Sequence, residues 1–370
     1  MGTRVVQVRS GREEQAATEG AEAISAGRLV AFATETVYGI AALTSNLEAM
    51  ERLRELKDRP SRPFSVHIAR PQDACRYVRR IPPPAERLMR KAWPGPLTLV
   101  LPVGKRLADA SLHRLGVYRQ LCWEGQIGLR CPDWAVTQSM LEKVSAPVVA
   151  PSANRAGAPS PRTGREVLEA LDGQIDLLID SGPTRYGTDS TIVRCDGEDW
   201  QVLRKGVYDT AAIRRLLRQR WLFACTGNTC RSPIAAGLAR KMIAECLKCT
   251  VQELPARGFD VVSAGVFAAD GLPPSPEAVR AVRRHGVDIS RHRSRKLTDE
   301  LIRSADLVLC MAQDHVAEVR RRVPTALART RRLDPCGDIS DPIGAGAGGY
   351  GSTADRIACL LKELIAKEVP

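Results

Sequence analysis

The chain has 370 residues, of which 44% are hydrophobic and 26% charged, and its formal net charge is +13. This length allows two domains with complete cores. No apolar run approaches the roughly 20 residues of a membrane span, and the first residues are too polar for a signal peptide, so we expect a cytoplasmic protein without membrane contact. The positive charge predicts polyanionic ligands such as nucleotides or RNA, or else an arginine-rich solvated surface.

Eleven cysteines are scattered along the chain. In a chain of this size, the pattern fits reduced thiols better than a disulfide framework. Cys246 and Cys249 form a C-x2-C pair with no second pair nearby. His285, His292 and His315 are more typical of surface or structural residues than of metal ligands. We therefore predict no protein-bound metal.

The first half of the chain alternates short strands, helices and turns. A strand at 5–8 and a helix at 13–26 precede an apolar run at 29–33, and apolar residues have helical spacing over 47–56. The remaining strands of this half are expected at 64–68, 97–102, 126–132, 146–150, 175–179, 189–193 and 202–206.

Two polar loops in this half could meet a ligand. Prolines at 60 and 63 prevent the preceding helix from continuing, so Lys57, Arg59 and Arg62 lie on a stiff loop. Three cations there could bind a triphosphate, although spacing alone favours a solvated loop. Residues 151–155, Pro-Ser-Ala-Asn-Arg, form a loop of small and polar side chains that a ligand could approach closely.

Five motifs in this half stand in the order found in a known family. They are Thr34-Glu-Thr-Val-Tyr-Gly, Lys57-x-Arg59, Trp93-Pro-Gly-Pro-Leu-Thr, Ser152-x-Asn154 and Ser190-Thr191. Over residues 10–207 the chain resembles the YrdC-like threonylcarbamoyl-AMP synthases, which are nucleotidyltransferases with a twisted-sheet α/β fold. Two departures are Ala33, where the family usually has proline, and a loop between Lys57 and His67 that is one residue short.

The resemblance implies that this domain joins L-threonine, bicarbonate and ATP into threonylcarbamoyl-AMP and pyrophosphate. The product would pass to the tRNA threonylcarbamoyl transferase machinery, and Mg²⁺ would neutralise the phosphates. Threonine would be bound by Thr36, His67, Arg130, the Ala150 backbone and Ser190. ATP would be bound by Lys57, Arg59, Ser152, Asn154, Ser160 and Arg204. A different class of function is a non-enzymatic module whose basic surface holds double-stranded RNA.

Residues 208–220 connect the two halves. Their apolar spacing is helical, four arginines lie among them, and the segment runs directly into an apolar strand at Trp221. There is no Gly/Ser linker. We therefore expect a short, ordered connector before a second domain at 221–368.

The second domain opens with Trp221-Leu-Phe-Ala-Cys-Thr-Gly-Asn-Thr-Cys-Arg-Ser-Pro, which predicts a strand, a loop and a helix. Cys225 and Arg231 have C-x5-R spacing, so the loop can aim backbone N–H groups and the positive end of the helix at a tetrahedral oxyanion. In that field the thiol of Cys225 should be largely ionised at neutral pH. It could attack phosphorus while Arg231 holds two oxygens. The bland alternative is a buried structural cysteine before an ordinary turn.

This stretch resembles the signature of the low-molecular-weight protein tyrosine phosphatases. The resemblance makes Cys225 the nucleophile and Arg231 the phosphate ligand, with Gly227, Asn228 and Ser232 shaping the loop. The family also needs a general acid in an Asp-Pro pair near the C-terminus. Asp334-Pro335 and Asp341-Pro342 are both candidates, and we choose Asp341 because it precedes the glycine-rich stretch and the last helix.

Two positions in the loop bear on specificity and regulation. Thr229 resembles the threonine of protein-arginine phosphatases, whereas tyrosine-specific members carry an aliphatic residue there. Ile343, after Asp341-Pro342, offers no aromatic wall for phosphotyrosine. Cys230 stands where relatives hold a second thiol that can trap the oxidised nucleophile as a disulfide; the alternative is a passive small residue.

The remaining elements predict a three-layer α/β/α phosphatase domain. Strands at 260–264 and 307–311 alternate with helices after 233, at 276–286 and near the C-terminus, which favours a parallel sheet. We therefore predict a bifunctional enzyme whose second domain hydrolyses phosphoarginine in proteins. The closest alternative keeps both folds but makes the phosphatase tyrosine-specific.

Overall fold

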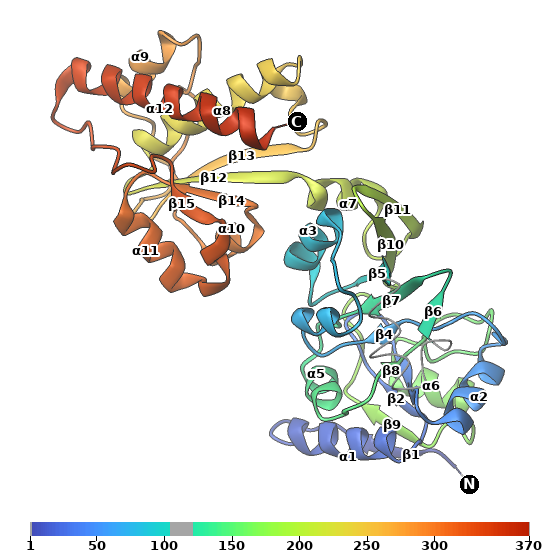
Figure 1. Ribbon diagram of the computed structural model, residues 1–370. Helices are drawn as coiled ribbons and strands as arrows, with labels where there is room; N and C mark the ends of the chain where they lie inside the picture. The colour runs from blue at the N-terminus through green and yellow to red at the C-terminus, as the bar shows by residue number, and fades with distance from the viewer. Residues whose placement is uncertain (1, 104–120, 370) are drawn as a thin grey trace. The chain divides into compact units, whose positions relative to one another are not determined.

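The computed structural model describes residues 2–103 and 121–369. It divides into two compact units, Met1–Leu216 and Leu217–Pro370, and both units are α/β (Figure 1). Each unit has its own sheet. The predicted fold class is confirmed for both.

The first unit is built on a mixed sheet. Within the described residues its strand order is β1-β9-β2-β3-β8-β4-β7-β5-β10-β11, and β6 pairs with β7. Parallel pairs are β1 with β9, β2 with β9, β4 with β7, and β5 with β10. The strands are β1 (Arg4–Gln7), β2 (Val30–Phe32), β3 (Gly39–Leu43), β4 (Val66–His67), β5 (Leu97–Pro102), β6 (Cys122–Trp123), β7 (Gln126–Arg130), β8 (Val148–Val149), β9 (Leu177–Asp180), β10 (Thr191–Asp196) and β11 (Asp199–Arg204).

Several of these strands are shorter than the apolar runs that predicted them. β7 ends at Arg130, before Pro132, and β8 begins only after Pro147. Proline has no N–H to donate to a neighbouring strand, so the inter-strand hydrogen bonds end near it. The short strands leave the residues beyond their ends free to form loops.

The helices of the first unit are α1 (Glu13–Ser25), α2 (Leu47–Leu56), α3 (Pro83–Ala92), α5 (Ala135–Glu142) and α6 (Gly164–Leu171), with a short 3-10 helix at Pro71–Arg76. The predicted helices at 13–26 and 47–56 are therefore present. α1 buries a face of small residues, and α5 packs closely on it. A Cβ added to Gly20 would lie 2.5 Å from Met140 Sδ, so a larger residue there would require the Met140 side chain to move.

The connector is ordered. α7 (Thr210–Leu217) forms from the apolar spacing of the segment, with Ile213 buried, and one residue separates it from β12 (Gln219–Cys225). The expected helical pattern is therefore present.

The second unit contains a sheet in the order β13-β12-β14-β15, in which every pair is parallel. The strands after β12 are β13 (Phe259–Gly265), β14 (Leu307–Cys310) and β15 (Thr330–Arg332). Figure 1 shows α8 (Arg231–Cys246), α9 (Pro276–Arg283) and α12 (Gly346–Glu368) on one face, and α10 (Asp299–Ser304) and α11 (Gln313–Arg322) on the other. The three-layer prediction is confirmed.

Alternation along β12 divides the core of this unit into two. Trp221 and Phe223 pack with α8, α9 and α12, whereas Leu222 and Ala224 pack with α10 and α11. Successive side chains of a strand point to opposite faces, so one apolar run serves both layers. Cys225 ends this strand on the α8 side.

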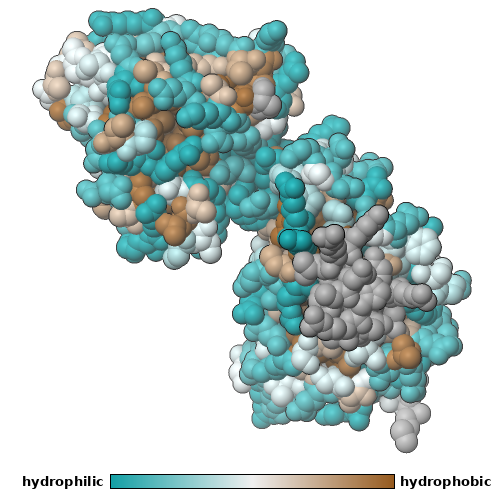
Figure 2. All heavy atoms as spheres, in the orientation of Figure 1, coloured by the Kyte–Doolittle hydropathy of each residue, from teal (hydrophilic) through white to brown (hydrophobic). Residues whose placement is uncertain are grey.

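The surface is mostly hydrophilic on the face in Figure 2, with hydrophobic residues in small groups. Among the described residues, no helix is long and apolar enough to cross a membrane.

Candidate active sites

The second unit places a phosphate-sized loop between β12 and α8. The loop begins at Cys225, the last residue of β12, and ends at Arg231, the first of α8. Asn228 adopts a positive φ of 56°, a conformation that asparagine tolerates better than most residues. The turn brings Cys225 under the positive end of α8, where backbone N–H groups attract an anion.

Asn228 holds the loop in shape through its side chain. Its Nδ2 donates to Ser232 Oγ at 2.9 Å and to Ser263 Oγ at 3.0 Å. Its Oδ1 accepts from the backbone N–H of Arg295 at 2.9 Å. Asn228 is fully buried, so this network ties the loop to β13 and to the segment around Arg295.

The sulfur of Cys225 is surrounded by hydrogen-bonding groups. Ser232 Oγ lies 2.9 Å from it, and the N–H of Asn228 points at it from 3.3 Å. Burial raises the pKa of the Cys225 thiol, and the contacts from Ser232, Asn228 and Arg231 oppose that rise. This burial acts against the ionised thiol that the spacing predicts. Ionisation therefore depends on those contacts and on the end of α8.

Arg231 contacts one of the two aspartates proposed as the general acid. Its Nη2 donates to Asp341 Oδ2 and, at 3.2 Å, to Thr226 Oγ1, while its Nη1 donates to the Ile339 carbonyl at 3.0 Å. Asp334 is instead buried and paired with Arg356 at 2.7 Å. The structure thus brings Cys225, Arg231 and Asp341 together and leaves Asp334 outside.

Thr229 and Cys230 lie on the wall of the loop. Thr229 is half-buried, and its Oγ1 is 3.6 Å from Cys230 Sγ. Cys230 Sγ also contacts Ser275 Oγ at 3.3 Å and the Tyr350 hydroxyl at 3.4 Å. A second thiol therefore stands in the same loop as Cys225, as the redox hypothesis requires, and both thiols are free here.

In the first unit, one group of polar residues gathers around Arg130 at the end of β7. Its Nη2 donates to Thr36 Oγ1 at 2.6 Å, Glu35 Oε1 at 3.0 Å and Thr34 Oγ1 at 3.2 Å. Arg130 is buried, yet its Nε has no hydrogen-bond partner among the described residues. An unsatisfied buried N–H of this kind could bind a carboxylate oxygen.

His67 lies next to this group on β4, which pairs with β7 at Arg130. Burial and the charge of Arg130 lower the pKa of His67 to about 3. Its ring stacks edge-on against Phe32, with centroids 6.3 Å apart. His67 is therefore a neutral imidazole at physiological pH. Ala150 is near the same strands, and its backbone N–H donates to the Ser65 carbonyl at 3.2 Å.

A second group lies around Lys57. Its Nζ donates to the carbonyls of Ser152 at 3.0 Å and Asn154 at 2.7 Å, and to Asn154 Oδ1 at 2.9 Å. Burial lowers the pKa of Lys57 to about 8. The solvated-loop interpretation is therefore wrong for Lys57, which points inward. Arg59 lies over the Phe64 ring at 5.3 Å.

A third group joins Ser190 to Arg204. Arg204 Nη2 donates to the Ser190 carbonyl at 2.9 Å, and its Nη1 is 3.5 Å from Asp189 Oδ2. Asp189 also accepts from Ser160 Oγ at 2.9 Å. Burial and, to a smaller extent, Arg130 lower the pKa of Arg204. The negative charge of Asp189 favours protonated Lys57, so it partly offsets the lowering of the Lys57 pKa by burial. The three groups are thus within electrostatic range of one another and form one polar, cation-rich region.

Comparison with known proteins follows this division. Residues 22–206 match the Sua5, YciO and YrdC family model, described as telomere recombination, and residues 220–369 match the model of the low molecular weight phosphotyrosine protein phosphatases. The threonylcarbamoyl-AMP synthase of Pyrococcus abyssi is 30% identical over 325 residues, which cover 81% of this chain and 92% of that protein. The chain belongs to the Sua5/YrdC synthase family and, through its second unit, to the low-molecular-weight phosphatase family.

Two relatives of the phosphatase unit differ in their substrates. The protein-arginine-phosphatase of Geobacillus stearothermophilus is 37% identical over 153 residues, which cover 40% of this chain and 95% of that protein. The probable low molecular weight protein-tyrosine-phosphatase EpsP of Ralstonia solanacearum is 40% identical over 123 residues, which cover 33% of this chain and 76% of that protein. Both belong to enzyme families, and neither match settles the specificity of this unit.

The synthase unit also resembles a solved structure. The crystal structure of P. abyssi Sua5 complexed with L-threonine has a TM-score of 0.51 and 25% identity, and the match covers 71% of this chain and 92% of that chain. The fold of the synthase unit is therefore that of Sua5.

Several residues near the two sites were not predicted from the sequence. In the synthase unit these are Glu35, Asp189 and Thr98, whose Oγ1 lies 3.0 Å from Ser190 Oγ. Glu35 and Asp189 are the direct neighbours of Thr36 and Ser190, which were proposed, and that adjacency was the available signal. In the phosphatase unit His292 and His315 contact the loop, at Asn228 O and Thr226 Oγ1. Their contact with the loop had no local signal in the sequence.

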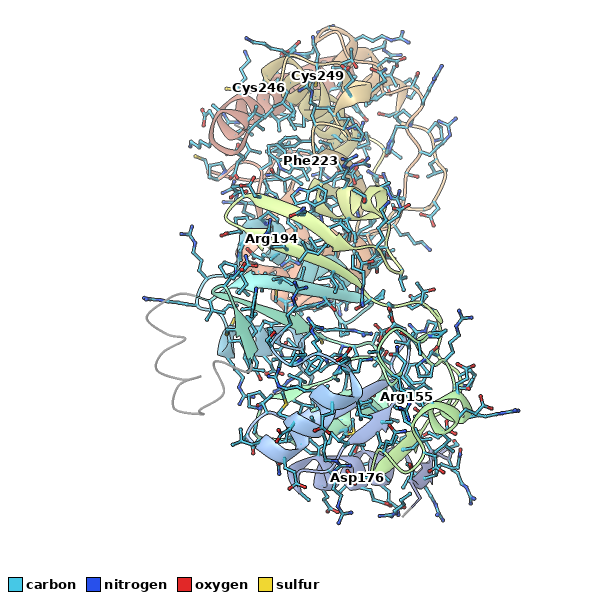
Figure 3. All side chains as sticks on the ribbon, turned by 90° about the vertical axis from the view of Figure 1, so that its right-hand side faces the viewer. Arg155, Asp176, Arg194, Phe223, Cys246 and Cys249 are labelled. Atoms are coloured by element: carbon cyan, nitrogen blue, oxygen red, sulfur yellow. The ribbon has the colours of Figure 1, made fainter. Side chains whose placement is uncertain are left out.

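The described residues contain no group of three or more His, Cys, Asp or Glu side chains that could hold a metal ion. Cys246 and Cys249, labelled in Figure 3, lie at the C-terminal end of α8, the end opposite Arg231.

Proposed function

We propose that the synthase unit joins L-threonine, bicarbonate and ATP into threonylcarbamoyl-AMP and pyrophosphate for tRNA modification. The observation that carries the threonine site is the buried Arg130 guanidinium with an unsatisfied Nε beside the hydroxyl of Thr36. A free carboxylate fits this fork, and the neutral His67 beside it adds no competing charge. Ser190 and the Ala150 backbone would complete the contacts.

ATP would lie across the cations of Lys57, Arg59 and Arg204. Lys57 donates to Ser152 and Asn154, and Arg204 donates to Ser190, so bound phosphates would exchange with these protein acceptors. The amine of threonine would take up bicarbonate with loss of water, and a carbamate oxygen would attack the α-phosphate. Pyrophosphate would leave among the cations, with Mg²⁺ as a counter-ion on the phosphates.

The synthase proposal is tested by pyrophosphate release. Release that requires both threonine and bicarbonate supports it. The alternative, a module that binds double-stranded RNA, predicts salt-sensitive RNA binding without any pyrophosphate release. Arg130→Gln is the informative variant, because it should lose threonine-dependent release while an RNA-binding surface elsewhere would keep its affinity.

We propose that the phosphatase unit hydrolyses phosphoarginine in proteins through a phosphocysteine. Cys225 Sγ would form a bond to phosphorus as the bond from phosphorus to the guanidinium nitrogen breaks, and Asp341 would protonate that nitrogen. Water would then attack the phosphocysteine, giving its proton to Asp341 and releasing phosphate. The contact between Arg231 and Asp341 supports this arrangement. Incoming phosphate would take over Arg231 and free Asp341 for the leaving group.

Thr229 is the basis for preferring phosphoarginine. Its hydroxyl stands in the wall of the loop, where it suits a polar guanidinium better than an aromatic face. The exposed Ile343 after Asp341-Pro342 provides no aromatic wall. The similarity to a tyrosine phosphatase keeps phosphotyrosine as the second candidate.

The deciding experiment compares phosphoarginine and phosphotyrosine peptides with the intact chain, Cys225→Ser and Thr229→Ile. Preference for phosphoarginine that Thr229→Ile weakens would support the proposal. Preference for phosphotyrosine would make the second candidate correct. Loss of all hydrolysis in Cys225→Ser is expected in either case, and full activity in that variant would contradict the phosphocysteine mechanism.

A further inference from the structure

A hollow of about 600 Å³ opens beside the phosphate loop of the phosphatase unit. Its walls come from the loop itself, from the segment after β13 and from α11. Its charged and polar lining is Thr226, Asp314, His315, Glu318 and Arg321, and its apolar lining includes Phe267 and Ala317. None of them has a role in the proposed chemistry.

Thr226 joins this hollow to the site of phosphate binding. Its Oγ1 accepts from Arg231 Nη2 at 3.2 Å and lies 3.0 Å from His315 Nε2. The same residue therefore lines the hollow and touches the arginine that holds phosphate. A protein chain with its phosphorylated side chain at Cys225 would place a neighbouring residue within reach of the hollow.

The hollow presents an aromatic ring to solvent. The Phe267 side chain is 79% exposed, although its backbone N–H is fixed to the Thr226 carbonyl at 3.0 Å. Ala317 on α11 lines the same space. A single exposed apolar side chain is normal on a protein surface, so the Phe267 ring is informative here because it lines the same hollow as Ala317 and Asp314.

The hollow also contains an uncompensated carboxylate. Glu318 is neutralised by Arg321 at 2.8 Å and Arg322 at 2.6 Å. Asp314 is exposed, and its carboxylate has no ion pair or hydrogen bond in the part of the chain that the structure describes. An acidic residue in the first turn of a helix is favourable by itself, and Asp314 has this position in α11. That preference explains Asp314 alone and does not explain why Phe267 is exposed in the same hollow.

We propose that this hollow binds a lysine or arginine side chain next to the phosphorylated residue of a substrate protein. The inference rests on the proposed phosphatase function. The aliphatic stem of the basic residue packs against Phe267 and Ala317, and its cation lies between the Phe267 ring and the Asp314 carboxylate. A glutamate at the same place would face Asp314 and be disfavoured.

The test uses phosphopeptides that differ only in the flanking residues, which are lysine, glutamine or glutamate, on either side of the phosphorylated residue. We expect kcat/KM to be about three- to tenfold higher with lysine than with glutamine on one of the two sides. Asp314→Asn and Phe267→Ala should each reduce this ratio toward unity. Glu363→Gln, which changes an exposed carboxylate on α12, should keep it.

Two further measurements separate this inference from the proposed function. Hydrolysis of p-nitrophenyl phosphate reports the chemistry without a flanking residue, so its absence would count against the phosphatase proposal itself. Binding of the same peptides to Cys225→Ser reports the flanking preference without turnover. Equal affinity for lysine, glutamine and glutamate peptides in that variant, or a lysine preference that survives both Asp314→Asn and Phe267→Ala, would overturn the inference.

Discussion

Arg130 Nη2 donates to Glu35 Oε1 at 3.0 Å, and the Glu35 side chain has no exposed surface. The other oxygen, Oε2, accepts from the backbone N–H of Asp133 at 3.0 Å. Glu35 thus holds the arginine proposed to bind threonine, and it ties the segment after β2 to the end of β7. Each carboxylate oxygen accepts a hydrogen bond, so the ionised side chain of Glu35 is satisfied although it is buried.

We predict that Glu35→Gln destabilises the synthase unit and weakens threonine binding. The amide NH2 of glutamine must face one of the two donors, and Arg130 is left as a buried charge without a counter-ion. The loss should be about 3 kcal/mol of unfolding free energy, with a KM for threonine raised about tenfold. Thermal unfolding and threonine-dependent pyrophosphate release measure the two effects.

The matched control is Glu169→Gln, because Glu169 pairs with Arg165 on the exposed surface of α6. Such a pair contributes only about 0–1 kcal/mol. If Glu35→Gln behaved like Glu169→Gln in both measurements, Glu35 would have no positioning role.

We predict that ATP binding at the proposed site around Lys57 depends on pH. Because burial lowers the pKa of Lys57 to about 8, its positive charge is lost as pH rises through that value. Affinity for ATP should therefore fall up to about tenfold between about pH 7.5 and about pH 9.5. Lys57→Arg keeps its charge over this range and should flatten the profile. Equilibrium binding of a non-hydrolysable ATP analogue measures this affinity in the absence of threonine, whose amine would titrate in the same pH range. A flat profile for the unmodified chain would contradict the prediction.

Ser232 should lower the pKa of Cys225. Its Oγ lies 2.9 Å from the sulfur, and a hydrogen bond to the thiolate favours ionisation. Ser232→Ala removes this hydrogen bond, so burial is less opposed and the pKa of the thiol should rise. The pH dependence of iodoacetamide alkylation, followed at Cys225 by mass spectrometry, measures the shift. Ser352→Ala on α12, where the hydroxyl bonds only to helix carbonyls, is the control. An unshifted alkylation midpoint in Ser232→Ala would exclude this role.

Asp341 and Asp334 should give opposite results when each is replaced by asparagine. Asp341→Asn removes the proposed proton donor and should reduce kcat by about 10²- to 10⁴-fold. Asp334→Asn weakens the pair with Arg356, so it should cost about 1–3 kcal/mol of stability and leave kcat within about threefold. Single-turnover hydrolysis and thermal unfolding distinguish them, and a larger kcat loss in Asp334→Asn would reverse the assignment.

The amino-acid sequence predicted those features that depend on neighbours along the chain. The strand, loop and helix around Cys225 follow from an apolar run, a C-x5-R spacing and a proline, all within 13 residues. The parallel sheet of the second unit and helices such as α2 follow from periodicity, because side-chain spacing fixes which face of an element is buried. The family motifs then supplied the candidate residues of both sites.

Tertiary structure decided the contacts between distant segments. Glu35 lies between β2 and β3, and it meets Arg130 at the end of β7 although three strands separate β2 from β7 in the sheet. Lys57 meets Asn154 because the loop after α2 turns inward. The choice of Asp341 over Asp334 depends on which loop reaches Arg231. Burial of Cys225 is also a property of the packed unit, and it opposes the ionised thiol that the local spacing predicts. Such contacts are set by strand order and by the packing of loops, which no local pattern of residues specifies.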